Sequence, residues 1–150
     1  MDDAIRRQIL QLLDQHRIMT LATLRPDGWP QATTVGYVNE GLSIYFLCGL
    51  ESQKARNLAY DARCSLTIDH DTPDLMAITG LSMAARAQVV RERAEAEKVV
   101  KMLALNYADP PPLDMKMPGP DEVRIFRLAP VVISVLDYTK GFGHTELVTC

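Results

Sequence analysis

The sequence lacks the features that mark several large classes of protein. Its 150 residues hold only three cysteines, Cys48, Cys64 and Cys150, in no metal-ligand spacing. An odd number of unclustered cysteines predicts free thiols rather than a disulfide framework. No apolar run approaches the roughly 20 residues that a membrane-spanning helix needs. The acidic start, Met1-Asp2-Asp3, is unlike a signal peptide. Together these absences predict a cytoplasmic protein without a membrane partner.

The sequence also lacks an excess of positive charge. The formal net charge is −3 and the sequence pI is about 5.6, which argues against a nucleic-acid-binding surface. No catalytic triad and no pair of catalytic acids stands out, and no histidine has a carboxylate at a metal-binding spacing, so no metal site is expected. Apolar residues make up 47% and charged residues 23%, as is usual for a soluble globular protein. We expect one domain, 1–150, that is large enough for a real core.

Short β-like segments dominate the chain. The turn at 25–28, which contains Pro26 and Gly28, and the turn at 39–41 are too short for crossover helices, so the sheet should be antiparallel. The expected strands are 17–24, 31–38, 42–47, 64–68, 75–90, 122–128 and 131–136, and the expected helices are 2–16, 52–60 and 91–106. Gly80 interrupts the longest strand segment and predicts a bulge or bend there. This pattern predicts a mainly β protein, a six- to seven-stranded antiparallel split β-barrel with about three outer helices.

Residues 108–120 are rich in proline, which removes backbone donors and fixes φ, so this segment should be irregular. Either a lid or a dimer arm would suit it, and the sequence does not decide between them.

Residues 52–57, at the start of the second expected helix, are the most informative stretch. Ser52 is a good N-cap, and Lys54 and Arg56 follow in the first turn. A helix dipole favours anions at this end, so two cations there indicate a phosphate that docks on the free N–H groups. The alternative is an ordinary solvated turn with surface charges.

The order of elements and the local residues resemble the pyridoxamine 5′-phosphate oxidase-like, FMN-binding split-barrel proteins. The resemblance runs from about Gln15 to Leu136. The residues that carry it are 20–23 (TLAT), 26–33 (PDGWPQAT), 44–47 (IYFL), 52–57 (SQKARN) and 61–66 (DARCSL). Their order and spacing together are fairly specific for the fold and moderately specific for a flavin.

The resemblance implies a flavin in a cleft between the two subunits of a homodimer. The cofactor-binding residues that it implies are Gln31, Ala32, Thr33, Thr34 and Val35 beside the ring, Phe46, Leu47 and Cys48 on the adjacent strand, and Ser52, Gln53 and Lys54 at the phosphate. Because alternate residues of a strand face one side, Gln31, Thr33 and Val35 present an amide, a hydroxyl and an apolar group to a polar-edged ring.

Two departures separate the chain from the vitamin B6 oxidases of this family. Those enzymes have an arginine at the start of the ring-side strand, where this chain has Gln31, and an arginine and histidine constellation near the C-terminus that has no match here. We therefore expect another, unidentified small-molecule substrate. In the tail, Lys140 and His144 are candidates to lie near N1 and O2 of the flavin, and the alternative is a flexible terminus.

An FMN-dependent oxidoreductase is the function that we expect, since the cofactor would supply the chemistry for which the sequence has no catalytic motif. The first alternative uses the deazaflavin F420, whose longer acidic tail needs more cations than Lys54 and Arg56 supply. The second is a non-enzymatic flavin- or haem-binding protein. A haem would need an axial histidine, and His144 is the one arguable candidate.

Overall fold

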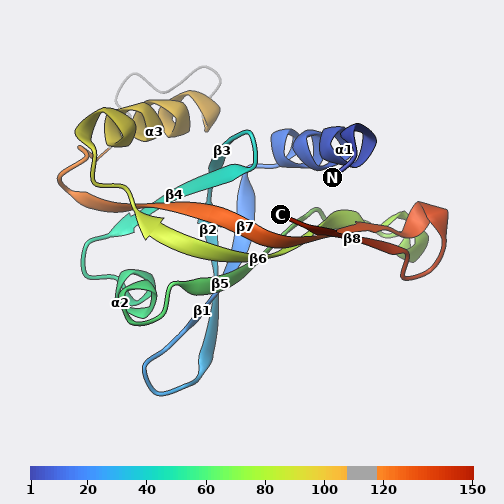
Figure 1. The fold of residues 1–150 in the computed structure, drawn as a ribbon, viewed down its shortest axis with the longest axis horizontal. Coiled ribbons are helices and arrows are strands. Elements are labelled where there is room, and N and C mark those ends of the chain that lie inside the picture. The colour runs from blue at the N-terminus through green and yellow to red at the C-terminus, as the bar shows by residue number, and fades with distance from the viewer. Residues whose placement is uncertain (108–117) are drawn as a thin grey trace.

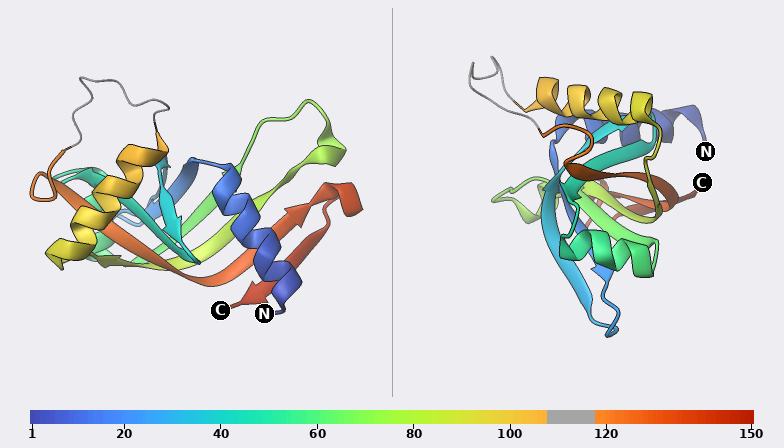
Figure 2. Two further views of the ribbon diagram at one scale, coloured as in Figure 1. Left: turned by 90° about the horizontal axis from the view of Figure 1, so that it is seen from above. Right: turned by 90° about the vertical axis from the view of Figure 1, so that its left-hand side faces the viewer.

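The computed structural model describes residues 1–107 and 118–150. In this part of the chain, one antiparallel sheet of eight strands curls round a core, and three α-helices lie on it (Figures 1 and 2). The helices are α1 (Asp3–Gln15), α2 (Gln53–Tyr60) and α3 (Arg93–Asn106), and the strands are β1 (Ile18–Leu24), β2 (Pro30–Gly36), β3 (Val38–Glu40), β4 (Ser43–Gly49), β5 (Arg63–Asp69), β6 (Thr79–Val89), β7 (Val123–Asp137) and β8 (Thr145–Thr149). Short 3₁₀ turns, η1 (Leu75–Ala77) and η2 (Tyr138–Lys140), precede β6 and follow β7. The predicted fold class, a mainly β antiparallel split barrel with three helices, is confirmed.

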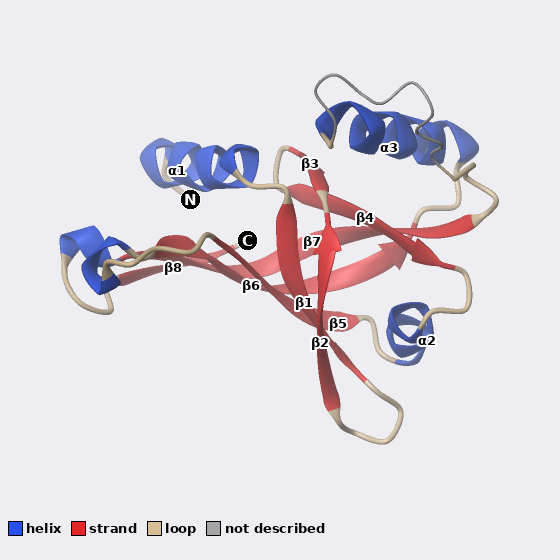
Figure 3. Cartoon of the chain, turned by 180° about the vertical axis from the view of Figure 1, so that it is seen from behind, coloured by secondary structure: helices blue, strands red, loops and turns tan. Residues whose placement is uncertain are grey.

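The strand order explains how the barrel curls. Along the sheet the strands run β2-β1-β5-β6-β7-β4-β3, with β8 added to β7. The two ends of this order, β2 and β3, are consecutive in the chain, so the sheet must bend round for Tyr37 to join them. Figure 3 shows this arrangement from behind, with β2 passing close to β3. The bend brings β2, which the sequence predicted to lie beside the flavin ring, near β4, which leads into α2.

The main core fills the inside of the curled sheet. Its fully buried side chains include Leu21, Phe46, Leu66 and Leu128, and α1 covers one opening. Asp2 caps α1, with its carboxylate accepting a hydrogen bond from the Ile5 N–H at 2.9 Å. A second, smaller core lies between α3 and the outer side of β3, β4 and β7, where it contains Val38, Tyr45, Val99, Leu103 and Ile125. The molecule therefore has two packed layers around one sheet.

The structure has more strands than the expected six or seven. The segment 31–38 divides at Tyr37 into β2 and β3, whereas 122–128 and 131–136 join into the single long strand β7. The C-terminal strand β8 was missed, because a short segment such as 145–149 becomes a strand only through its pairing with β7.

The prediction of a bulge or bend at Gly80 is wrong. Gly80 pairs in register with Asp69 on one side and Leu136 on the other, and the irregularity lies between Ala84 and Ala85. A Cβ at position 80 would stand 2.6 Å from the carbonyl oxygen of Ile68. Glycine is needed there for a close approach of two strands rather than for a bend.

Three further expectations concern the cysteines, membrane-spanning helices and the proline-rich segment. Cys48, Cys64 and Cys150 are all free thiols, as predicted, and the first two are buried. No helix in the described part of the chain is both long enough and apolar enough to cross a membrane. The expected lid or dimer arm at 108–120 falls mostly on residues 108–117, which lie outside the described residues.

Candidate functional site

The N-terminus of α2 has the form that the sequence predicted. Ser52 is the N-cap, and its Oγ accepts a hydrogen bond from the Ala55 N–H at 3.2 Å. The cap is held in turn by its own N–H, which donates to Gly49 O at 3.1 Å at the end of β4. Lys54 is half-buried in the first turn and forms no ion pair within residues 1–107 and 118–150. A charge left unpaired at this position is available to an anion.

A buried hydrogen-bond network ties this helix to the ring-side strand. The Asn57 side chain is 0% exposed, and its Nδ2 donates to Thr23 Oγ1 and to Gln31 Oε1, each at 3.0 Å. Its Oδ1 accepts from Gln53 Nε2 at 2.8 Å. Two predicted site residues, Gln31 and Gln53, are therefore joined through one amide. Sequence reasoning missed Asn57 and Thr23, although an asparagine between Ala55 and Leu58 on the buried face of α2 was a signal.

Strand β2 shows the expected alternation. Gln31, Thr33 and Val35 are half-buried, whereas Ala32 and Thr34 face outward and are exposed. The Thr33 Oγ1 atom is buried, and no atom of the described residues forms a hydrogen bond with it. Buried hydroxyls nearly always have a partner, so this one calls for a group that the chain does not supply.

The predicted residues of β4 divide between its two faces. Phe46 is 0% exposed and stacks on Phe126 with 5.3 Å between ring centroids, so only its backbone is open to a ligand. Leu47 points the other way and, with Val35 and Tyr107, lines a cavity of about 200 Å³ between β2, β4 and α3. Val35 and Leu47, far apart in sequence, thus meet at one cavity.

Cys48 lies at a corner of the structure where two cations, Lys54 and Arg124, act on its thiol. The sequence did not reveal this corner. In the β4–β7 ladder Cys48 lies opposite Arg124, which is half-buried. Burial raises the pKa of the Cys48 thiol, while a hydrogen bond from Ser52 and the charges of Lys54 and Arg124 act to lower this pKa. Arg124 was missed because its neighbours in space come from a distant part of the chain.

Lys140 and His144 lie at the other end of the sheet. Figure 1 places η2 and β8 on the right and α2 on the lower left. Both side chains approach Glu146, with Lys140 Nζ at 3.9 Å and His144 Nε2 at 3.5 Å from Oε1. The tail is an ordered strand rather than a loose terminus, and its last N–H, of Cys150, donates to Val131 O at 2.9 Å. Within one chain these two residues are not brought to the α2 site.

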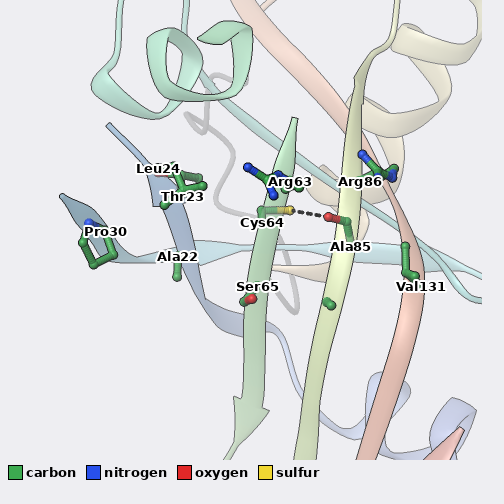
Figure 4. Close-up of a pocket in the computed structure, with 11 residues that line it drawn as sticks. Ala22, Thr23, Leu24, Pro30, Arg63, Cys64, Ser65, Ala85, Arg86 and Val131 are labelled. Carbon is green, nitrogen blue, oxygen red and sulfur yellow. Dashed lines mark hydrogen bonds between the residues drawn. The ribbon is translucent and has the colours of Figure 1, made fainter. Parts of the chain in front are cut away.

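A second hollow lies on the outer face of the sheet, across β1, β5 and β6 (Figure 4). Its volume is about 370 Å³. Small side chains at Ala22, Ser65 and Ala84 make room for it, and Arg63 and Arg86 stand at one end. None of the predicted site residues lines this hollow, so it belongs to a different surface.

Three further aromatic side chains lie at a turn, at a helix end and in a loop. Trp29, at the β1–β2 turn, is 71% exposed and is not a core residue. His16 is the C-cap of α1 and His70 lies in a loop. Their two rings stack, with 3.3 Å between Nε2 of His16 and Nδ1 of His70. No group of three or more His, Cys, Asp or Glu side chains in the described ranges is arranged to hold a metal ion.

Comparisons with known proteins agree with the fold. The model of the pyridoxamine 5′-phosphate oxidase family matches residues 5–137. A conserved hypothetical protein from Mycobacterium tuberculosis is 28% identical, with 97% of this chain and 91% of that chain covered and a TM-score of 0.78. The haem storage protein of Vibrio cholerae is 18% identical (95% and 92% covered, TM-score 0.66), and a haem-binding protein of Mycobacterium smegmatis is 22% identical (96% and 56% covered, TM-score 0.68). No curated protein matches the sequence.

The family match spans most of the chain, so this protein belongs to the pyridoxamine 5′-phosphate oxidase family.

Proposed function

We propose that this member of the family binds FMN between β2 and the N-terminus of α2 and acts as a flavin-dependent oxidoreductase on a small molecule. The observation that carries the proposal is the Gln53–Asn57–Gln31 network. Within residues 1–107 and 118–150, it couples a helix N-terminus at which Lys54 has no ion-pair partner to a strand on which the Thr33 hydroxyl has no hydrogen-bond partner. A phosphate at one end and a polar-edged ring at the other would satisfy both groups.

The chain's own residues would bind and orient the cofactor. Lys54 and the first-turn N–H groups of α2 would hold the phosphate, because its charge complements both the ammonium and the helix dipole. Thr33 Oγ1 would donate to or accept from the ring edge. Val35 and Leu47 would exclude water from one side of the site. Bound FMN would supply hydride or electron transfer, for which the protein provides position and electrostatics.

We also propose a homodimer that packs through the outer face of the sheet. Thr20, Ala22, Ser65 and Ala84 on this face are small and uncharged, so two copies can approach closely. Its charges lie at the ends of β5, where Arg63 and Arg86 form one end and Asp69 the other. A twofold axis through the face would set the arginine end of each copy against the Asp69 end of the other, which is a self-complementary arrangement.

Light scattering tests the dimer. We expect the wild-type protein to have twice the chain mass of 16.7 kDa. Ala84→Lys, which puts a charge at the centre of the face, should give a monomer, whereas Gln11→Lys on the exposed side of α1 should stay dimeric. A monomeric wild-type protein that binds flavin one to one would sink this geometry.

The test of the cofactor is the visible spectrum of the purified protein, with the mass of the chromophore released by heat. A flavin spectrum and the mass of FMN are the expected results. A colourless protein that also ignores added FMN would overturn the proposal.

Haem is the second candidate. Among the described residues, the buried His144 Nε2 has only the 3.5 Å approach of Glu146 Oε1, and two structurally similar proteins carry haem in their names. A Soret band that disappears in His144→Ala would favour haem over FMN. F420 remains the alternative within the oxidoreductase class.

A further inference from the structure

Two histidines from distant parts of the chain meet at the end of α1. His16 is the C-cap of this helix, and His70 lies in the loop between β5 and η1. Nε2 of His16 and Nδ1 of His70 are 3.3 Å apart, although the two positions are 54 residues apart in the sequence. The two atoms have the geometry of a hydrogen bond, so the ring nitrogens point toward each other.

The distance between these two nitrogen atoms also suits two ligands of one tetrahedral metal ion. Zinc binds histidine nitrogen at about 2.0 to 2.1 Å in tetrahedral geometry. Two such bonds at the tetrahedral angle place their nitrogen atoms roughly 3.3 to 3.4 Å apart, and the separation between the His16 and His70 nitrogens is 3.3 Å. An ion can therefore replace the hydrogen bond with little more than a tilt of the exposed His70 ring.

His16 is held in the way that metal-binding histidines are held. Its Nδ1 lies 2.7 Å from Leu12 O in the last turn of α1. A carbonyl oxygen only accepts, so Nδ1 carries the proton, and the lone pair of the neutral ring is on Nε2, the atom that faces His70. Histidine ligands usually donate their second N–H to a carbonyl or a carboxylate, which fixes the tautomer and the ring orientation. The helix itself thus orients His16 as a ligand.

The charges around the pair favour a cation. Asp69 and Asp71 flank His70 in the sequence, and Asp14 lies in the last turn of α1. None of these carboxylates forms an ion pair within residues 1–107 and 118–150. The C-terminal end of a helix dipole attracts positive charge, and the last turn of α1 contains no basic residue. Arg17 follows the C-cap, and its single charge is outweighed by the three carboxylates.

We propose that His16 and His70 together bind one Zn²⁺ or a similar divalent ion that prefers imidazole ligands. The described residues contain no group of three or more His, Cys, Asp or Glu side chains arranged around a metal, so water completes the coordination. On binding, the His70 proton moves from Nδ1 to Nε2, and the ion takes the lone pair left on Nδ1. The ion joins the end of α1, which covers one opening of the core, to the β5–η1 loop. This site is separate from α2 and β2 and does not depend on the proposed function.

Calorimetric titration of the untagged, full-length protein with ZnCl₂ tests the site. We expect saturation at one Zn²⁺ per chain and at least tenfold weaker binding to His70→Ala, whose side chain is exposed and is not part of the core. His144→Ala removes the third histidine of the chain, and Cys150→Ser removes its exposed thiol. Both are controls and should bind Zn²⁺ as the wild type does. A wild type that does not saturate up to about 1 mM Zn²⁺, or binding that survives His70→Ala, overturns the proposal.

Thermal unfolding distinguishes a bridge between two segments from an ion held by one histidine. An ion that binds the folded pair more tightly than the unfolded chain stabilises the fold. Zn²⁺ should therefore raise the unfolding midpoint of the wild type, but not that of His16→Ala or His70→Ala. Mg²⁺, which prefers oxygen ligands, should leave all three midpoints unchanged. Zn²⁺ binding that depends on His70 but leaves the wild-type midpoint unchanged overturns the bridge to His16.

Discussion

The surroundings of α2 and α3 differ in how their charges are satisfied. Around α3, Arg127 and Lys98 have carboxylate partners: Arg127 Nη1 lies 2.9 Å from Glu95 Oε2, and Lys98 Nζ lies 3.0 Å from Glu40 Oε2. The exposed Lys101 of α3 has none among the described residues. Around α2, Lys54, Arg56 and Arg124 have none among the described residues. The comparison indicates that α3 is a structural cover, whereas α2 has charges suited to an external anion.

Buried polar groups follow the same division. On the α3 side, Tyr45 donates to Glu95 Oε2 at 3.0 Å, so its hydroxyl is satisfied within the chain. On the α2 side, the Asn57 network ends at Gln31 and Gln53, and nearby Thr33 Oγ1 has no partner in the described residues. The paired groups of the α3 side contribute stability. The α2 side combines the paired network around Asn57, which also contributes stability, with open groups that are suited to binding. Four predictions test this difference.

The largest expected effect is that of Asn57→Ala. The substitution removes a fully buried amide and leaves Thr23, Gln31 and Gln53 without their common partner. We expect it to lower the free energy of unfolding by about 2 kcal/mol. Urea unfolding of the two proteins measures the difference, and a change under about 0.5 kcal/mol would mean that the network contributes little.

Lys54→Ala tests the α2 side in binding. It should weaken FMN binding by about 1 to 3 kcal/mol without unfolding the protein, because a charged contact to the phosphate is lost. Lys98→Ala is the matched control, since Lys98 already has Glu40 as its partner, and FMN affinity should stay the same. Equal affinities of the wild type and Lys54→Ala on fluorescence titration would remove Lys54 from the site.

Glu95→Gln tests the α3 side. It leaves the shape of the side chain unchanged but removes the charge that pairs with Arg127, and both groups are partly buried. We expect a loss of about 1 kcal/mol in the free energy of unfolding and no change in FMN affinity. Thermal unfolding and an FMN titration on the same variant measure the two quantities. A large loss of FMN affinity would show that α3 shares in the site.

The smallest expected effect is a difference between two buried thiols. Burial raises the pKa of Cys64 to about 11, and no cation opposes it, whereas Lys54 and Arg124 act to lower the pKa of Cys48. Alkylation at pH 9 should therefore proceed fastest at the exposed Cys150, then at Cys48, and slowest at Cys64. Arg124→Gln should slow the reaction of Cys48 alone, as peptide mass spectrometry would show. An unchanged alkylation rate of Cys48 in Arg124→Gln would place Arg124 away from the Cys48 thiol.

The same thiol gives a pH dependence of stability. Because burial raises the pKa of Cys64 in the folded protein above its ordinary value of 9.0, the unfolded chain loses its proton first as the pH rises. The contribution of Cys64 to stability is then present below about pH 9 and lost progressively toward pH 11. Cys64→Ala should reduce this alkaline loss in unfolding experiments between these pH values.

Local features of the site were predictable from the sequence. The N-cap at Ser52, the turn at Gly28 with its φ of +91°, and the alternation of Gln31, Thr33 and Val35 each depend on residues a few positions apart. The antiparallel fold class followed from the same short-range signals. These features needed no knowledge of distant contacts.

The features that were missed all depend on pairing between distant segments. Arg124 lies near the N-terminus of α2 because β7 pairs with β4. Asn57 contacts Gln31 because α2 packs on β1, with which β2 pairs. The irregularity at Ala84, wrongly expected at Gly80, arises from the register of β6 against β7. Strand β8 exists because β7 offers it an edge. None of these partners is visible in a local pattern.

The sequence by itself determined the three helices and most of the strands, the cap of α2 and the face that β2 turns to the core, because backbone preferences and side-chain period act over a few residues. Only the tertiary structure decided which cations of the described residues lack a carboxylate partner there and which hydroxyl of those residues lacks a hydrogen bond. These are properties of pairs brought together by the curl of the sheet, and the free energy that selects the curl comes from burial of the whole core.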